Sequence, residues 1–281
     1  MTDTPRPRDT RLVSRIVVGV VFAPAVLWLF WTGGYPLFAF LALLVLAGQS
    51  ELFRMPSDGM PLAQRIVAHT AGIAVVADAF FFRGGHAAGI VSAALILFFI
   101  AETLGAAPEG RLRRVMFALL ATFYPAVFFS YIPKIWNNQA ELFSGGGHLV
   151  LILVVASVWM FDIASYFTGT IAGKHLFIPS VSPKKTWEGF FGGVIGSAVV
   201  GFCASLIPGF QLPHAVAIAL LAGLAGQAGD LAESIVKRDM GVKDSSTLLG
   251  GHGGVLDRFD SMAFAAPAVY GYLVLVARGC A

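Results

Sequence analysis

Nine apolar segments follow one another along the chain, and short polar stretches separate them. A membrane-spanning helix needs about 20 mostly apolar residues, with a range of about 17–25. The pattern therefore predicts an all-α, polytopic membrane protein: a bundle of about nine transmembrane helices. The second segment is short and could form a tight hairpin with the first across Thr32, Gly33 and Gly34. The predicted spans are 16–32, 35–50, 66–82, 87–104, 115–133, 148–168, 190–207, 213–231 and 259–277.

The composition favours lipid over water as the surroundings of most of the chain. Its 281 residues are 57% hydrophobic and 12% charged, whereas soluble domains are about 45–50% apolar and about 25% charged. The net charge of +3 does not indicate a nucleic-acid partner, because the basic residues lie in short clusters between apolar segments. The basic N-terminus resembles a signal peptide, but its apolar run continues through Trp31, so we expect a retained first span.

Lysine and arginine are distributed unevenly between the two sides of the predicted bundle. With the N-terminus in the cytoplasm, nine alternating spans place 16 of the 19 basic residues on the cytoplasmic side. Cytoplasmic loops are enriched in these residues, which predicts a cytoplasmic N-terminus and an external C-terminus. No polar linker divides the chain. We expect one membrane domain, with N-terminal helices in 1–147 and helices that carry a cytoplasm-facing site in 148–281.

Four aspartates from three predicted spans are expected to meet at the cytoplasmic end of the bundle. Ionisable side chains inside spans are expensive in lipid, so they indicate function by default. Carboxylates also bind divalent cations through oxygen. Asp78 and Glu102, in other spans, favour a structural or solvated role. The four aspartates are Asp162, Asp230, Asp257 and Asp260.

Two cytoplasmic loops, 173–189 and 234–260, face these carboxylates in the predicted topology. Basic side chains beside carboxylates are the groups that phosphoryl transfer needs, because cations neutralise charge on the transferring phosphate. The alternative is that these are ordinary basic loops that contact anionic lipid headgroups. That interpretation is weaker here, because the loops combine both signs of charge with glycines and with rigid residues such as Pro183 and Trp187.

Other motifs in this region favour less specific roles. The segment Gly169 to Lys174 does not fit a Walker A loop, which needs four residues between its glycines and Ser or Thr after the Lys. His252 has no second His or Cys at ligand spacing, which favours a phosphate hydrogen bond or loop packing over metal binding. Glycines four apart in the seventh span, within 189–196, let helices approach closely; packing inside the bundle is favoured, with a homodimer contact as the alternative.

Residues 234–260 resemble the signature of the phosphatidate cytidylyltransferases, also called CDP-diacylglycerol synthases. The signature begins Ser-x-x-Lys-Arg, continues through Lys-Asp and ends His-Gly-Gly-x-x-Asp-Arg-x-Asp, and this chain matches it without departure. Residues 182–189 resemble a second motif of the family, and the segment from Asp162 to Lys174 resembles a third. The resemblance carried by motifs covers roughly 159–262.

The resemblance implies that phosphatidic acid is joined to the cytidylyl part of CTP, which forms CDP-diacylglycerol and pyrophosphate. It also implies a requirement for Mg²⁺, with a second cation left open, at the cytoplasmic face of a bacterial inner membrane. The expected metal ligands are Asp230 and Asp257, with Asp260 and Asp162 as weaker candidates. The residues expected to act in catalysis are Asp257, Asp230, Lys237, Arg238 and Arg258. Those expected to bind substrate are Ser182, Lys184, Lys185, Thr186, Lys174, Lys243 and His252.

Three other functions were weighed against this one. A transporter also carries charges within its spans, but here the charges gather at one face rather than the midplane, and no inverted repeat is visible. A CDP-alcohol phosphotransferase would carry a different aspartate pattern, which we do not find. A non-catalytic membrane anchor would leave the converging carboxylates unexplained.

Overall fold

The computed structural model describes residues 22–56, 59–105, 109–137, 146–246 and 253–279. All nine predicted spans fall on helices, which confirms an α-helical bundle; the part of the first span at 16–21 lies outside the described residues. A helical segment, Phe22–Thr32, comes first. The helices that follow are α2 (Gly34–Arg54), α3 (Leu62–Phe81), α4 (Ala87–Leu104), α5 (Arg111–Phe129), α6 (Tyr131–Trp136), α7 (Gly147–Ala172), α8 (Trp187–Ser205), α9 (Leu212–Asp239) and α10 (Leu256–Gly279).

The lengths and composition of these helices are those of a multi-pass membrane protein. Among the described residues, seven helices are long and apolar enough to cross a membrane: α2, α4, α5 with α6, α7, α8, α9 and α10. Phe22–Thr32 is shorter, and α3 is not among the seven, so the count of nine stays a prediction. The outer face of α8 exposes Phe191, Ile195, Val199 and Phe202, an apolar stripe that lipid would cover.

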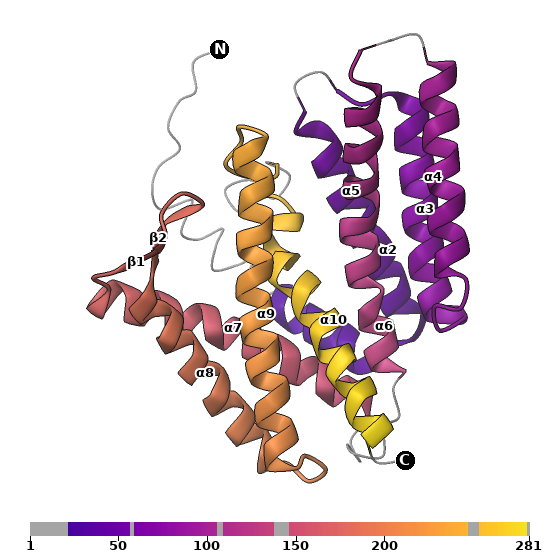
Figure 1. The fold of residues 1–281 in the computed structure, drawn as a ribbon. Coiled ribbons are helices and arrows are strands. Elements are labelled where there is room, and N and C mark those ends of the chain that lie inside the picture. The colour runs from indigo at the N-terminus through magenta and orange to yellow at the C-terminus, as the bar shows by residue number, and fades with distance from the viewer. Residues whose placement is uncertain (1–21, 57–58, 106–108, 138–145, 247–252, 280–281) are drawn as a thin grey trace.

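Two groups of helices pack side by side, and α10 lies between them (Figure 1). Helices α2 to α5 form one group, and α7, α8 and α9 form the other. The last helix packs mainly against α9 and also contacts α2, α5, α6 and α7. The N-terminal end of α10, which carries the aspartates at the end of the signature, therefore contacts both groups of helices.

Small residues let α7 and α8 approach closely. A methyl group added to Gly193 would lie 2.7 Å from the ring of Phe161, and one added to Gly196 would lie 2.8 Å from the side chain of Ala164. Gly192 likewise faces Thr168. The glycines at four-residue spacing thus pack inside the bundle, as favoured above, and they give no support to a homodimer contact.

The loop 173–189 contains a small antiparallel hairpin that the sequence pattern did not predict. Strand β1 (Leu176–Ile178) pairs with β2 (Ser182–Thr186), and β2 leads directly into α8. Thr186 caps α8, because its hydroxyl accepts a hydrogen bond from the backbone N–H of Gly189 at 3.1 Å. The carboxylate of Glu188 accepts from the ring of His175 at 2.6 Å, which fixes the base of the hairpin.

Candidate active site

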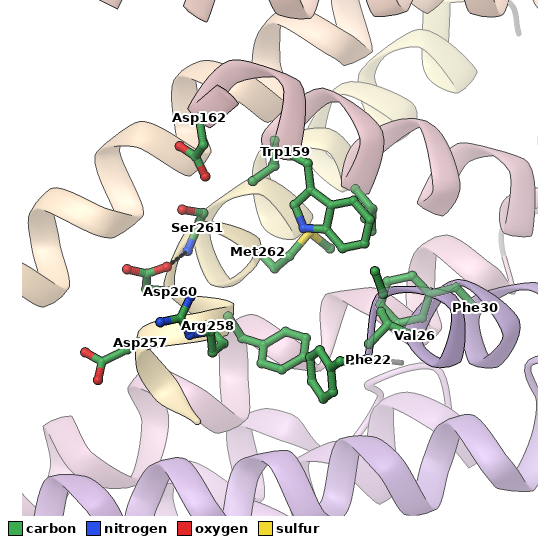
Figure 2. Close-up of a pocket in the computed structure, with 14 residues that line it drawn as sticks. Phe22, Val26, Phe30, Trp159, Asp162, Asp257, Arg258, Asp260, Ser261 and Met262 are labelled. Carbon is green, nitrogen blue, oxygen red and sulfur yellow. Dashed lines mark hydrogen bonds between the residues drawn. The ribbon is translucent and has the colours of Figure 1, made fainter. Parts of the chain in front are cut away.

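Helices α7, α9 and α10 supply the four aspartates that the sequence predicts to converge. A cavity of about 650 Å³ brings three of them together, since its walls include Asp162, Asp257 and Asp260. Figure 2 shows these carboxylates and the guanidinium of Arg258 at one end of the cavity. Asp230 does not line this cavity.

The opposite end of the same cavity is apolar. The helical segment before α2 contributes Phe22, Val26 and Phe30, while Trp159 of α7 and Met262 of α10 complete the walls (Figure 2). Val26 and Phe30 also belong to the buried core of the bundle. The cavity is therefore amphipathic, with charged groups at one end and a hydrocarbon-like lining at the other.

A second cavity, of about 500 Å³, lies under the β-hairpin. Asp162 lines both cavities, so the two are adjacent at this residue. Other walls come from α7, α8 and α9. The residues of β2 that line it are Ser182, Lys184, Lys185 and Thr186, all four of which the motif resemblance marks as substrate-binding.

An ion pair ties the hairpin to α9. The Nζ of Lys185 contacts Oδ2 of Asp230, and the two side chains are 25% and 32% exposed. Both groups can reach water, so a polyanion or a cation that entered the smaller cavity could exchange partners with them. The structure thus holds a predicted phosphate-binding lysine against a predicted metal ligand.

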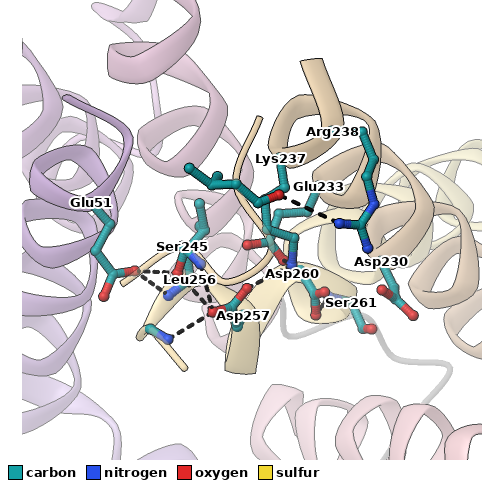
Figure 3. Close-up of polar contacts among 12 residues, drawn as sticks. Glu51, Asp230, Glu233, Lys237, Arg238, Ser245, Leu256, Asp257, Asp260 and Ser261 are labelled. Carbon is teal, nitrogen blue, oxygen red and sulfur yellow. Dashed lines mark hydrogen bonds and ion pairs between the residues drawn. The ribbon is translucent and has the colours of Figure 1, made fainter. Parts of the chain in front are cut away.

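Asp257 is the centre of a polar network at the start of α10 (Figure 3). Its Oδ1 accepts a hydrogen bond from Nζ of Lys237 at 2.6 Å. Its Oδ2 faces three donor atoms, which are the backbone N–H of Ser245 at 3.0 Å, the hydroxyl of Ser245 at 2.9 Å and the backbone N–H of Gly254 at 2.7 Å. Asp257 therefore ties Ser245 to Gly254 at the start of α10, in addition to any contact with a cation.

Glycine stands at each of the two positions before α10 for a different geometric reason. Gly253 has φ +76°, a left-handed conformation that residues with a side chain rarely adopt. A methyl group on Gly254 would lie 2.6 Å from a carboxylate oxygen of Glu51 and would also collide with the hydroxyl of Ser245. The Gly-Gly pair of the signature thus lets the backbone pass between two buried polar side chains.

The sequence reasoning missed Glu233, which lies on α9 one turn after Asp230. Its side chain is fully buried, and within the described chain neither carboxylate oxygen accepts a hydrogen bond. The Nζ of Lys237 lies 3.4 Å from its Oε2, and the buried carboxylate of Asp260 is close enough to interact with it electrostatically. The spacing of Asp230, Glu233 and Lys237 on one helical face was the available signal.

This arrangement can be compared with known proteins. A sequence profile of the cytidylyltransferase family matches residues 13–276. The chain belongs to the cytidylyltransferase family. The resemblance inferred from the motifs is therefore confirmed, and it extends beyond them to most of the chain.

Several relatives of the chain are bacterial proteins called phosphatidate cytidylyltransferase. One from Synechocystis sp. is 31% identical in an alignment of 300 positions, gaps included, that covers 95% of this chain and 97% of that protein. One from Staphylococcus aureus is 31% identical over 259 residues, 92% of this chain and 95% of that protein. One from Bacillus subtilis is 37% identical over 163 residues, where the alignment spans 57% of this chain and 59% of the relative.

The remaining predicted site residues have varied positions in this member of the family. Arg258 is exposed and lines the larger cavity. Arg238 is exposed and donates to the carbonyl of Val242 at 3.5 Å. Lys174 and Lys243 are exposed and line neither of the two cavities. His252 lies outside the residues that the structure describes.

The residues present fit the magnesium ion expected for the family. Among the described residues, no three His, Cys, Asp or Glu side chains form a ready ligand group. Mg²⁺ does not require one, because it usually takes one or two carboxylates and keeps waters and substrate phosphates as its other ligands. Glu233 supplies a buried carboxylate whose oxygens accept no hydrogen bond in the described chain, and Asp260 lies beside it. A divalent cation would neutralise this concentration of negative charge.

Proposed function

We propose that this member of the cytidylyltransferase family transfers the cytidylyl group of CTP to phosphatidic acid, which yields CDP-diacylglycerol and pyrophosphate. The observation that carries the proposal is the junction of two unlike cavities at Asp162. One is amphipathic, as a lipid phosphate requires, and the other is lined by lysines and hydroxyls, as a nucleotide phosphate requires. A reaction between a lipid and a water-soluble nucleotide needs such a meeting point.

The larger cavity suits the lipid substrate. Phe22, Phe30 and Trp159 provide an apolar lining for the glycerol end of the acyl chains. Arg258, at the charged end, provides a guanidinium that can bind a phosphate through two parallel hydrogen bonds. Phosphatidic acid would then present its phosphate beside Asp162 while its chains extend into the bilayer.

The smaller cavity suits the triphosphate of CTP. Lys184 and Lys185 contribute ammonium groups, and Ser182 and Thr186 contribute hydroxyls, all from one short strand. An incoming triphosphate would attract Lys185 away from Asp230 and free that carboxylate for a cation. The hairpin thus supplies a compact phosphate-binding surface at the membrane boundary.

The chemistry requires orientation more than proton transfer. An oxygen of the phosphatidate phosphate attacks the α-phosphorus of CTP in line, and the bond from that phosphorus to the bridging oxygen breaks. Pyrophosphate leaves with the electron pair. The nucleophile is already anionic near neutral pH, so the protein chiefly holds the two phosphates together and offsets their charge.

Carboxylates of α9 and α10 would hold the magnesium ion, which when bound neutralises charge on the transferring phosphate. Asp230 and Asp257 are the ligands that the motifs favour, with Asp260 and Asp162 as further candidates, and the buried Glu233 adds a fifth carboxylate nearby. Lys237, Arg238 and Arg258 would offset the remaining charge. A second cation, monovalent or divalent, is a further candidate for the same site.

The proposal places the reaction at the cytoplasmic face of a bacterial inner membrane, with the N-terminus in the cytoplasm. The support is the uneven distribution of lysine and arginine, which puts both signature loops on the basic side. CTP is made and used in the cytoplasm, so a site that opens there meets its substrate. A homodimer remains an expectation that analytical ultracentrifugation in detergent can decide.

The direct test is a turnover assay with detergent-purified protein, phosphatidic acid and CTP labelled at the α-phosphate. We expect label to enter the lipid extract only when both phosphatidic acid and Mg²⁺ are present. Label that appears with Mg²⁺ and a different phospholipid, but not with phosphatidic acid, would change the assigned acceptor. No label from monodisperse protein with any acceptor would overturn the proposal.

A further inference from the structure

Glu51, near the C-terminal end of α2, makes contacts that no motif in the sequence indicates. Its side chain is 2% exposed, although it belongs to the N-terminal group of helices. Its Oε1 accepts hydrogen bonds from the hydroxyl of Ser246 at 2.6 Å and from the backbone N–H of Val255 at 2.8 Å. Its Oε2 accepts from the hydroxyl of Ser245 at 3.0 Å and from the backbone N–H of Leu256 at 2.8 Å.

All four donors belong to the signature segment that leads into α10, and Figure 3 shows two of the residues that supply them, Ser245 and Leu256. Two of them are backbone N–H groups at the start of α10, which have no partner within the helix itself. A carboxylate at this position also interacts favourably with the helix dipole. Glu51 therefore caps α10 from a different part of the chain, in the way that a local Asp or Ser caps other helices.

The Ser245 side chain connects this cap to the candidate site. Its hydroxyl lies 3.0 Å from Oε2 of Glu51 and 2.9 Å from Oδ2 of Asp257. A hydroxyl has one proton, so it donates to one of the two carboxylates at a time. The backbone N–H of Ser245 donates to Asp257 in addition, at 3.0 Å. Any movement of Ser245 thus changes the orientation of Asp257, which in turn holds Lys237.

We propose that Glu51 is a positioning residue for the cytidylyl transfer. It holds Ser245 and the first turn of α10 so that Asp257 and Lys237 face the site, while Glu51 itself lines neither of the two cavities. The inference rests on the proposed function, because it takes Asp257 to be part of the active site. It assigns a specific role in the reaction to the otherwise motif-free helix α2.

The decisive variant is Glu51→Gln, which keeps size and shape. Its amide offers one acceptor oxygen, so its NH₂ group must face the backbone N–H of either Val255 or Leu256, which cannot turn away. We expect kcat to fall about 10- to 100-fold, the effect typical of residues that orient a ligand-binding side chain. The apparent Michaelis constants for both substrates should change little, since Glu51 lines neither cavity.

The matched control is Gln49→Met on the same helix. Gln49 is fully buried and donates to the carbonyls of Ala68 at 3.0 Å and Thr122 at 3.2 Å, but it has no hydrogen bond to the described residues of the signature segment. This variant should lose thermal stability to a similar degree and keep its turnover per folded protein. Equal kcat values for Glu51→Gln and Gln49→Met, measured on monodisperse protein, would overturn the proposal.

A second variant covers the case in which Glu51→Gln does not fold. Ser245→Ala removes the shared hydroxyl and leaves both backbone hydrogen bonds of Glu51 in place. It should lower kcat several-fold with an unchanged melting temperature; an unchanged kcat would overturn the link between the two carboxylates. If wild-type protein and Gln49→Met both lacked turnover, the proposed function would fail instead, so the two failures are distinguishable.

Discussion

Buried carboxylates occur in both groups of helices, but their surroundings differ. In the N-terminal group, Glu102 is 5% exposed and accepts a hydrogen bond from Nη2 of Arg114 at 2.6 Å, with two further contacts to Nε. Asp78 is 3% exposed and accepts from the ring and the backbone N–H of His86 at 2.8 and 3.1 Å. These contacts fit the structural role that the sequence favoured for both residues.

The C-terminal group leaves its buried carboxylates less completely bonded. Glu233 is fully buried, and in the described part of the chain it accepts no hydrogen bond. Asp260 is 8% exposed and accepts from the backbone N–H of Ser261 at 2.6 Å, which leaves its second oxygen for other partners. Asp260 lies with Asp257 at the charged end of the larger cavity (Figure 2), and Glu233 lies near Asp260 (Figure 3).

The difference shows how to separate packing from function in a membrane protein. A buried carboxylate that lacks a full set of partners is costly, so a fold retains one only where a ligand completes its surroundings or where function requires it. Exposure alone does not distinguish the two cases, since Glu102 and Glu233 are both buried. The number of hydrogen bonds that each carboxylate accepts does distinguish Glu102 and Asp78 from Glu233.

The largest effect is expected from Asp257→Asn. The amide NH₂ would face either Lys237 or the backbone N–H of Gly254, and the carboxylate charge would be lost, so turnover should fall to background while the protein still inserts. Formation of CDP-diacylglycerol by purified protein measures it. Asp239→Asn, the same change at an exposed position at the end of α9, is the control and should be fully active. Activity near that of the wild type in Asp257→Asn would exclude both the metal-binding and the organising role.

Glu233→Gln should separate activity from stability. Turnover should fall about 10- to 100-fold, as for other groups that support a metal site. The melting temperature in detergent should stay constant or rise, because the substitution removes a buried charge without a full set of partners. A variant that is both less stable and fully active would show that Glu233 behaves like the carboxylates of the N-terminal group.

Lys185→Ala should act on substrate binding. The variant removes the ion pair with Asp230 and one ammonium group of the smaller cavity. The apparent Michaelis constant for one substrate should rise about tenfold, since a hydrogen bond to a charged group contributes about 1.5–3 kcal/mol. Initial rates at varied CTP and varied phosphatidic acid identify that substrate, and Lys185→Arg is the charge-preserving control. If neither constant nor kcat moved, Lys185 would be an ordinary surface lysine.

The smallest effect on turnover is expected from Glu102→Gln. Removal of one partner of a buried ion pair costs about 3–5 kcal/mol, and the Arg114 side chain, 17% exposed, can regain part of this in water. The melting temperature should therefore fall while turnover per folded protein stays constant. A loss of turnover at constant stability would mean that Glu102 is not merely structural.

Much of the fold could be predicted because apolar segments of span length form helices in lipid. The β-hairpin formed by β1 and β2 could not be predicted in this way. Strand β1 has three residues and β2 has five, and β2 carries Lys184 and Lys185 rather than an alternating apolar pattern. Its support is the packing of Phe177 against Trp187, with ring centroids 4.5 Å apart. That contact joins residues on opposite sides of the hairpin, and no local periodicity reveals it.

The candidate site was predictable where its residues share a motif. Asp162, Asp257 and Asp260 line one cavity, as their common depth in the membrane suggested. Glu233 was missed because a lone Glu before a signature looks like one more charge at a helix end. Glu51 had no signal at all, since its partners lie 194 to 205 residues away in the sequence. Only the packed helices bring them together.

The separation between Glu51 and its partners also sets the order in which the molecule can be completed during synthesis. A ribosome adds about 5–20 residues per second, so the 205 residues from Glu51 to Leu256 take roughly 10 to 40 s. During that time α2 carries a carboxylate whose four donors have not yet been made. Until α10 is synthesised, Glu51 must therefore remain at a hydrated boundary of the membrane or in contact with the insertion machinery. The insertion of α10 then completes the bundle, and a chain that stopped before residue 245 would lack all four donors of the Glu51 carboxylate.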